Sequence, residues 1–144
     1  MTIELVPRFT VDDRRLSALH ARAFNGDPAD VQPWLQRLTR HALTWIGAFE
    51  ADRLIGFVQV CWDGGSHAFL LDTAVDPEKQ HRGIGAALVE AAAEEVRAAG
   101  CEWLHVDFEP HLEHFYLDRC HFEATRAGLI RLKQVRPRPS TAGR

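Results

Sequence analysis

The segment Val75–Leu88, which reads VDPEKQHRGIGAAL, most restricts how this chain can fold. The apolar stretch His67–Val75 before it predicts a buried strand, and Pro77 turns the chain. Two glycines then open the segment Gly83–Ala99, whose apolar residues recur at helical spacing until Gly100 ends it as a C-cap. The chain must therefore place a central strand, a tight loop and a long helix in direct succession.

The loop between this strand and helix is suited to a polyanion. The first turn of a helix leaves backbone N–H groups without partners, and the helix dipole adds partial positive charge there. Gly83 and Gly85 remove side chains that would keep phosphate oxygens from the backbone. Lys79, His81 and Arg82 add positive charge on the same loop. The position between a strand and a long helix favours a phosphate cradle over an ordinary turn.

Two common phosphate-binding motifs do not match. A dinucleotide fingerprint needs a third glycine near position 88, where Leu88 stands, and a Walker-type loop needs Gly-Lys-Ser/Thr, which is absent. The spacing by itself thus indicates a polyanion at a helix N-terminus.

The rest of the chain alternates between segments with the periodicity of strands and segments with the periodicity of helices. The length of 144 residues fits one domain, which we expect over 1–134, followed by a flexible tail at 135–144. The order predicts a mixed α/β (α+β) fold. We expect strands at Ile3–Arg8, Thr44–Glu50, Leu54–Trp62, His67–Val75, Cys101–Phe108 and within Phe122–Lys133, and helices from Asp12 or Asp13 to Phe24, at Ala29–His41, Gly83–Ala99 and Pro110–Arg119.

Composition excludes several classes of partner. The net charge of −3 gives no field that would draw the chain onto nucleic acid or an anionic membrane. No apolar run approaches the length of a membrane-spanning helix, and Met1–Phe9 lacks the features of a signal peptide. The three cysteines are far apart and lack a CxxC spacing, so we expect a reduced, cytoplasmic protein.

At this point the residues resemble a known family. Gln80–Gly85 is similar to the Gln/Arg-x-x-Gly-x-Gly/Ala motif of the GNAT N-acetyltransferase superfamily, and Val75-Asp76-Pro77 is the usual approach to it. Downstream, Phe115–Phe122 resembles the Phe-Tyr-x-x-x-Gly-Phe segment that closes the cofactor site. The resemblance implies a single-domain GNAT-like fold, with a mixed, mostly antiparallel central sheet of about six or seven strands flanked by about four helices.

The resemblance also implies a coenzyme site for acetyl-CoA as co-substrate, without a metal. The pantetheine arm would pair with the backbone of Thr73, Ala74 and Val75. Tyr116 would be the general acid for the departing thiolate, since a neutral phenol can donate to it; the alternative is that Tyr116 only packs on the pantetheine. The pyrophosphate would lie on the amides of a continuous run: His81, Arg82, Gly83, Ile84, Gly85 and Ala86.

The group that binds and deprotonates the acceptor amine is less clearly marked. Asp72 is an acid in an otherwise apolar strand, which is costly unless it faces a cleft or has a partner. It corresponds to an acidic residue that many family members use to contact the amine; the alternative is a structural pair with a nearby His or Arg. His105, Glu50 or a water chain are further candidates for the base.

Two residues depart from the family pattern. His121 takes the place of the glycine before the last phenylalanine, in a turn that often needs positive φ. Glu109 stands where many members have an asparagine that binds the cofactor arm, and a carboxylate can accept from an amide N–H but cannot donate.

We expect transfer of an acetyl group from acetyl-CoA to a primary amine of a small molecule by direct attack. A protein or peptide N-acetyltransferase and a non-enzymatic acyl-CoA-binding module are the alternatives. By the resemblance, Phe24, Asn25 and Trp34 belong to the wall of the acceptor site. The sequence also allows a homodimer, because apolar and polar residues alternate along Ala127–Lys133 well enough for this segment to pair with another strand.

Overall fold

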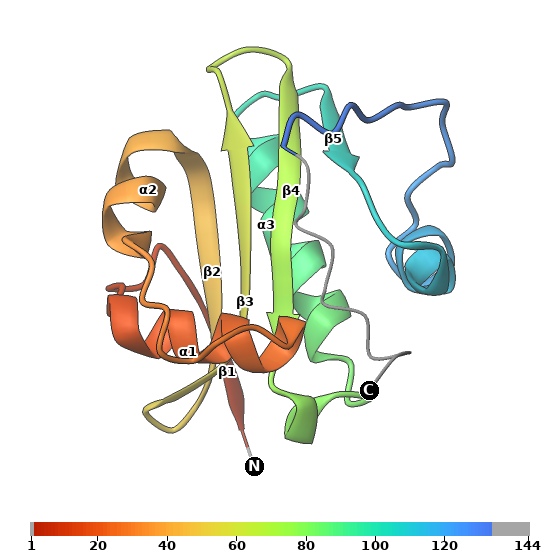
Figure 1. Ribbon diagram of the computed structural model, residues 1–144. Helices are drawn as coiled ribbons and strands as arrows, with labels where there is room; N and C mark the ends of the chain where they lie inside the picture. Colours follow the sequence, from red (N-terminus) through yellow and green to blue (C-terminus); the bar gives the residue numbers. More distant parts are fainter. Residues whose placement is uncertain (1, 134–144) are drawn as a thin grey trace, which may run out of the picture.

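The computed structural model describes residues 2–133, and the tail expected at 135–144 lies outside them. Five strands form one sheet in the order β1-β2-β3-β4-β5 (Figure 1). The first four are antiparallel neighbours, and β5 runs parallel to β4. The strands are β1 (Ile3–Pro7), β2 (Ala42–Glu50), β3 (Arg53–Trp62), β4 (His67–Val75) and β5 (Trp103–Val106).

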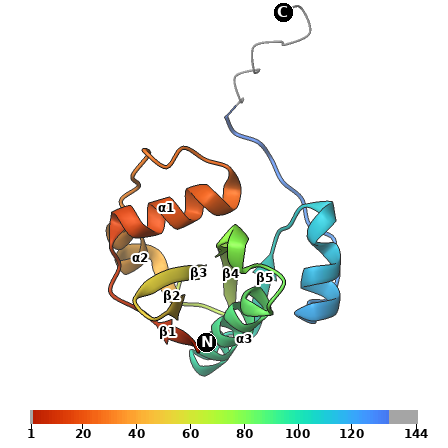
Figure 2. The same cartoon turned by 90° about the horizontal axis from the view of Figure 1, so that it is seen from below.

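Helices cover both faces of this sheet. Figures 1 and 2 show α1 (Asp13–Phe24) and α2 (Trp34–His41) on one face and α3 (Ile84–Ala98) on the other. Beyond β5, a short 3-10 turn η2 (Pro110–Leu112) leads into a π-helical turn η3 (His114–Arg119). The expected mixed α/β fold with a central sheet and about four helices is confirmed. Within residues 2–133, no helix has the length and apolar character needed to cross a membrane.

The sheet separates two apolar clusters. Ile46, Val58 and Leu70 point toward α3 and pack with Leu88 and Ala92. On the opposite face, residues of β3 and of the first two helices pack together, among them Phe57, Leu16, Leu38 and Trp34. Alternation along β3 therefore serves both faces, which is why nearly the whole strand is buried.

The predicted strand count was wrong. In the described residues the sheet has five strands, and Phe122–Lys133 contains none. Leu129, Ile130 and Leu132 are 81%, 84% and 90% exposed. A strand is stable only with a partner for its backbone groups, and β5 has only four residues, so an alternating pattern alone did not produce a hairpin beside it.

Some helix boundaries also differ. The helix expected at Ala29–His41 begins only at Trp34, because Asn25 ends α1 in the left-handed region and Pro33 precedes the first helical turn of α2. Gln32 instead donates its backbone N–H to the Ser17 hydroxyl at 2.9 Å. The helix expected at Pro110–Arg119 is divided between η2 and η3. The late start of α2 leaves a loop, rather than a helical turn, between the C-terminus of α1 and the N-terminus of α2.

Candidate active site

A bulge in β4 organises the site. On β3, Phe57 and Gln59 pair with Ala74 and Leu71, so two residues of β4, Asp72 and Thr73, lie opposite one residue of β3. Asp72 adopts φ 58°, a left-handed conformation that aspartate tolerates better than most residues. The bulge turns the Asp72 side chain toward α1.

The Asp72 carboxylate is held by two side chains. His20 Nε2 lies 2.9 Å from Oδ1, and Gln59 Nε2 donates to Oδ2 at 2.6 Å. Burial raises the pKa of Asp72, but the hydrogen bonds from His20 and Gln59 and the charges of His20 and Arg37 outweigh it, so the pKa lies below its ordinary value. The expected structural partner thus exists, yet the Asp72 side chain stays 25% exposed and can also contact a ligand.

His20 belongs to an aromatic wall. Its ring lies 4.5 Å from the ring of Phe24 and 5.1 Å from that of Trp34, between ring centroids. Trp34, expected at the acceptor wall, is 2% exposed and forms the backing of this wall rather than its surface. His20 was not predicted as a site residue. Its only local signal was an imidazole among the apolar positions of the first helix.

The edge of β4 next to the bulge is open on the β5 side. β5 pairs with β4 from His67 to Leu70 only, while β4 continues to Val75. Within the described residues, the backbone of Thr73, Ala74 and Val75 therefore has no strand partner on that side. This is the stretch predicted to pair with the pantetheine arm, and an extended polar chain fits there as an added strand.

The predicted phosphate cradle lies at the N-terminus of α3. Gly83 is the N-cap of α3 with φ 81°, and no side chain within residues 2–133 caps the helix, so the first N–H groups of α3 are available to an anion there. A Cβ atom on Gly85 would stand 3.2 Å from the Phe115 ring, so only glycine fits this packing without movement of the ring. His81 and Arg82 are exposed on the same loop. A pyrophosphate therefore fits these residues.

Lys79 does not contribute free charge to the cradle. Its ammonium lies 2.9 Å from the Glu50 carboxylate, and both side chains are mostly buried. The hydrogen bond from Lys79 lowers the pKa of Glu50 against a smaller opposing effect of burial. Glu50 is thus ionised and paired with a residue of the phosphate loop. Its lowered pKa makes it a weak base, which argues against Glu50 as the group that deprotonates the amine.

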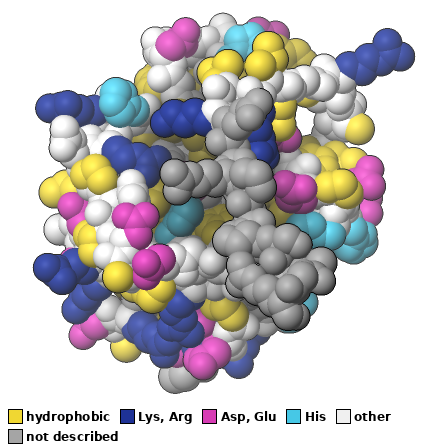
Figure 3. All heavy atoms as spheres, in the orientation of Figure 1, with side chains coloured by type: hydrophobic (Ala, Val, Ile, Leu, Met, Phe, Trp, Pro, Cys, Tyr) yellow, Lys and Arg dark blue, Asp and Glu magenta, His cyan; other side chains and the backbone are white. Residues whose placement is uncertain are grey.

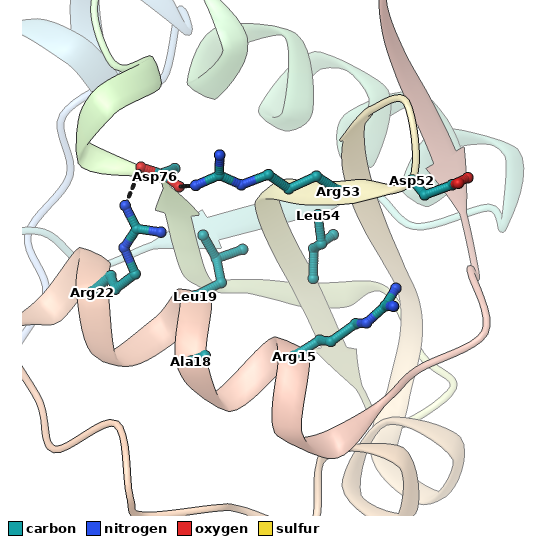
Figure 4. Close-up of a pocket in the computed structure, with 8 residues that line it drawn as sticks. All are labelled: Arg15, Ala18, Leu19, Arg22, Asp52, Arg53, Leu54 and Asp76. Carbon is teal, nitrogen blue, oxygen red and sulfur yellow. Dashed lines mark hydrogen bonds and ion pairs between the residues drawn. The ribbon is translucent and has the colours of Figure 1, made fainter.

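Asp76, at the start of the phosphate loop, connects this loop to α1 and β3 (Figure 4). It is 1% exposed and lies 2.9 Å from Arg22 of α1 and 3.1 Å from Arg53 of β3. The same carboxylate accepts the Glu78 backbone N–H and so caps the 3-10 turn η1 (Pro77–Lys79). A cavity of about 360 Å³ lies beside these groups. Because Asp76 already pairs with Arg22 and Arg53, which line this cavity with it, we assign Asp76 a structural role rather than a ligand-binding one.

Residues 12–122 match the Acetyltransferase (GNAT) family. The chain belongs to this family. It is 30% identical over 90 residues to the GCN5-related N-acetyltransferase 1, chloroplastic, of Arabidopsis thaliana, a match that covers 62% of this chain and 45% of that protein, so the chain spans less than half of that relative's length.

Solved structures agree on the GNAT fold. Glucosamine-6-phosphate N-acetyltransferase from Arabidopsis thaliana superposes with a TM-score of 0.77 at 13% identity, covering 93% of this chain and 100% of that one. AAC(6')-Iy, in complex with the bisubstrate analogue CoA-S-monomethyl-acetylneamine, gives 0.72 at 18% identity, with coverage of 94% and 100%. At these identities the likeness concerns the fold alone.

Tyr116, the predicted general acid, is buried beside the bulge. Its ring stacks on Phe108 at 5.1 Å and meets Phe115 edge-on at 4.9 Å. Burial raises the pKa of Tyr116 above 10.0; the Thr73 hydroxyl opposes this and the Cys120 thiol adds to it. The Thr73 hydroxyl is itself buried without a well-formed hydrogen bond. The Tyr116 phenol is therefore neutral at neutral pH and lies beside Thr73 on the open side of β4.

The match to the second GNAT motif needs a correction. Four residues, 117–120, separate Tyr116 from His121, whereas the motif Phe-Tyr-x-x-x-Gly has three. The π-helical turn η3 absorbs the extra residue, as the bond from Cys120 N–H to the Phe115 carbonyl shows. His121 then adopts φ 64°, the conformation expected for the glycine it replaces.

Two other predicted residues lie apart from Asp72. His105 stacks on Phe69 with a centroid distance of 4.6 Å, and its Nε2 lies 2.7 Å from Nδ1 of His67. Glu109 is exposed at the start of η2 and makes no side-chain cap. The structure thus brings together Asp72, Thr73 and Tyr116 at the bulge, with His105 farther along the same sheet and Glu50 at the phosphate loop.

Proposed function

We propose that this acetyltransferase moves an acetyl group from acetyl-CoA directly to a primary amine of a small molecule. The observation that carries the proposal is the β4 bulge. One of its residues, Asp72, belongs to a carboxylate–imidazole pair on the α1 side, and the next, Thr73, lies beside Tyr116 and the open edge of β4. An amine bound at Asp72 and a thioester lying along the edge of β4 at Thr73 would meet at the bulge.

The pair of Asp72 and His20 suits the binding and deprotonation of an amine. If the Nε2–H of His20 donates to Asp72, its Nδ1 keeps a lone pair that can accept a proton from the amine. The lowered pKa of Asp72 keeps its carboxylate ionised, which would stabilise the imidazolium that forms. Acetyl-CoA supplies the acetyl group, and the Tyr116 phenol donates a proton to the departing thiolate.

Direct transfer is favoured over an acylated cysteine. Burial raises the pKa of Cys61, and the charge of Asp72 adds to the rise. Burial likewise raises the pKa of Cys120. Both thiols near the bulge are therefore poor nucleophiles, since the thiolate is the reactive form.

The decisive experiment is release of coenzyme A from acetyl-CoA by the purified chain with a panel of small primary amines and a panel of peptides. Amine-dependent release supports the proposal. Release with peptides alone would assign it instead to a peptide N-acetyltransferase, and no release with either would contradict it.

A homodimer is also proposed. Leu129, Ile130 and Leu132 expose their side chains almost fully, and in the described residues the outer edge of β5 has no strand partner. Pairing with a second copy would satisfy both features. Light scattering after size-exclusion chromatography would test it, and a monomer at micromolar concentration would contradict it. All three cysteines are free, which agrees with the cytoplasmic location that we propose.

A further inference from the structure

Arg37 is a charged side chain that the proposed chemistry does not use. It lies on α2, with its guanidinium carbon 4.3 Å from the centroid of the Trp34 ring, where cation–π attraction holds it. It has no ion pair among residues 2–133. The Trp34 ring in turn lies 5.1 Å from the ring of His20, the partner of Asp72, so the guanidinium stands on the α1 and α2 side of the bulge. Its charge also lowers the pKa of both Asp72 and Cys61.

An exposed apolar surface continues from the same region. Leu71 pairs with Gln59 and Phe69 with Cys61, so these four residues share the sheet face toward α1 and α2. Phe69 and Leu71 are 48% and 44% exposed on it. In the orientation of Figure 3, basic and histidine side chains border hydrophobic ones on this face of the molecule. An acceptor would therefore meet an anionic group, an apolar surface and a cationic group together.

We propose that the acceptor is an amine that also carries an anionic group, a carboxylate or a phosphate, which Arg37 binds while the amine contacts Asp72. The hydrocarbon part between the two groups lies against Phe69 and Leu71. This inference rests on the proposed function and narrows its substrate class. A guanidinium suits this role because its planar fork matches both carboxylate and phosphate.

A simpler role for Arg37 would be to stabilise the charge of Asp72. The two roles differ in what they predict for neutral acceptors. If Arg37 only tunes Asp72, its removal must affect every amine alike. If it binds the acceptor, its removal must affect only acceptors with an anionic group.

The test compares ω-amino carboxylates of increasing length with the neutral amides of the same acids, and with aminoalkyl phosphates, for the wild type, R37Q and R40Q. Arg40 lies on the same helix and is exposed, and among the described residues it forms no ion pair. For the best length, the wild type should favour the anionic acceptor over its amide by about 10- to 100-fold in kcat/KM, the range for a charge-assisted hydrogen bond. Comparing the amino carboxylates with the aminoalkyl phosphates shows which of the two anionic groups Arg37 prefers.

R37Q should remove this preference while lowering kcat/KM for the amide by less than about fivefold, and R40Q should retain the preference. Equal losses for anionic and neutral acceptors in R37Q would overturn the inference and leave the proposed function intact, as would a wild type without preference. A wild type that acetylates no amine would overturn both.

Discussion

The carboxylate of Asp72 and the imidazole of His20 lie 2.9 Å apart although 52 residues separate them in sequence. The contact connects the β4 bulge to α1. It gives an acid in an apolar strand a partner, and it uses one imidazole nitrogen, so that in the proposed function the second accepts the proton of the amine.

This pair should act as a unit in catalysis. D72N and H20Q should each lower kcat/KM by about 10²- to 10⁴-fold, the usual range for loss of acid–base assistance. The double variant should be little worse than either single one, because each change already disables the pair. H41Q, an exposed histidine of α2, is the matched control. Losses that multiply in the double variant would show that the two residues act independently.

Tyr116 should affect turnover more than coenzyme binding. Y116F should lower kcat by about 100-fold or more, because the phenol no longer donates a proton to the thiolate. The Kd for acetyl-CoA, measured by calorimetry, should stay nearly constant because the ring remains. Since burial raises the pKa of Tyr116 above 10.0, the wild type should keep the protonated acid throughout neutral and mildly basic pH. Wild-type turnover by Y116F would remove the assignment.

The contribution of Asp72 to stability should depend on pH. Its folded-state pKa is lower than the ordinary value of 3.8, so its ionised form stabilises the folded protein above that pH. This contribution should disappear as the pH falls through the folded-state pKa. The difference in free energy of unfolding between the wild type and D72N should therefore be largest near neutral pH and shrink below about pH 4. Urea titrations at several pH values measure it; a constant difference would argue against the pair.

Gly83 and Gly100 offer a matched test of the cradle. Both have positive φ, 81° and 88°, and a Cβ on either would meet no atom of the described residues within 4 Å apart from its chain neighbours. G83A and G100A should each destabilise the fold by about 1 kcal/mol through backbone strain. Only G83A should also weaken acetyl-CoA binding, because it lies at the N-terminus of α3. Equal affinity in the two variants would place the pyrophosphate elsewhere.

Asp76 should matter for stability. D76A should cost about 3 kcal/mol, because it leaves two arginines and the Glu78 N–H without their buried acceptor. R22A or R53A should cost about 1 kcal/mol or less, since each arginine is partly exposed and the other still pairs with Asp76. Chemical denaturation measures all three. Similar losses in the three variants would contradict a shared carboxylate.

The features that the sequence predicted well are local. Gly83 and Gly85 after a buried strand indicate a cradle because the conformations they require depend on neighbouring residues alone. The two motifs also led to the GNAT family, which the comparison over residues 12–122 confirms. By contrast, the alternation at Phe122–Lys133 predicted strands that the described residues do not form, since a strand needs a partner that no local pattern supplies.

What the sequence by itself determined is therefore the α/β class, the succession of strand, glycine loop and helix, and the membership of the GNAT family. Only the tertiary structure decided how the charges of the site are used. It brought His20 to Asp72, paired Lys79 of the phosphate loop with Glu50, and set Arg37 over the Trp34 ring. The physical reason is that the state and role of a charge depend on groups within a few ångströms, and in a folded chain these come from distant parts of the sequence.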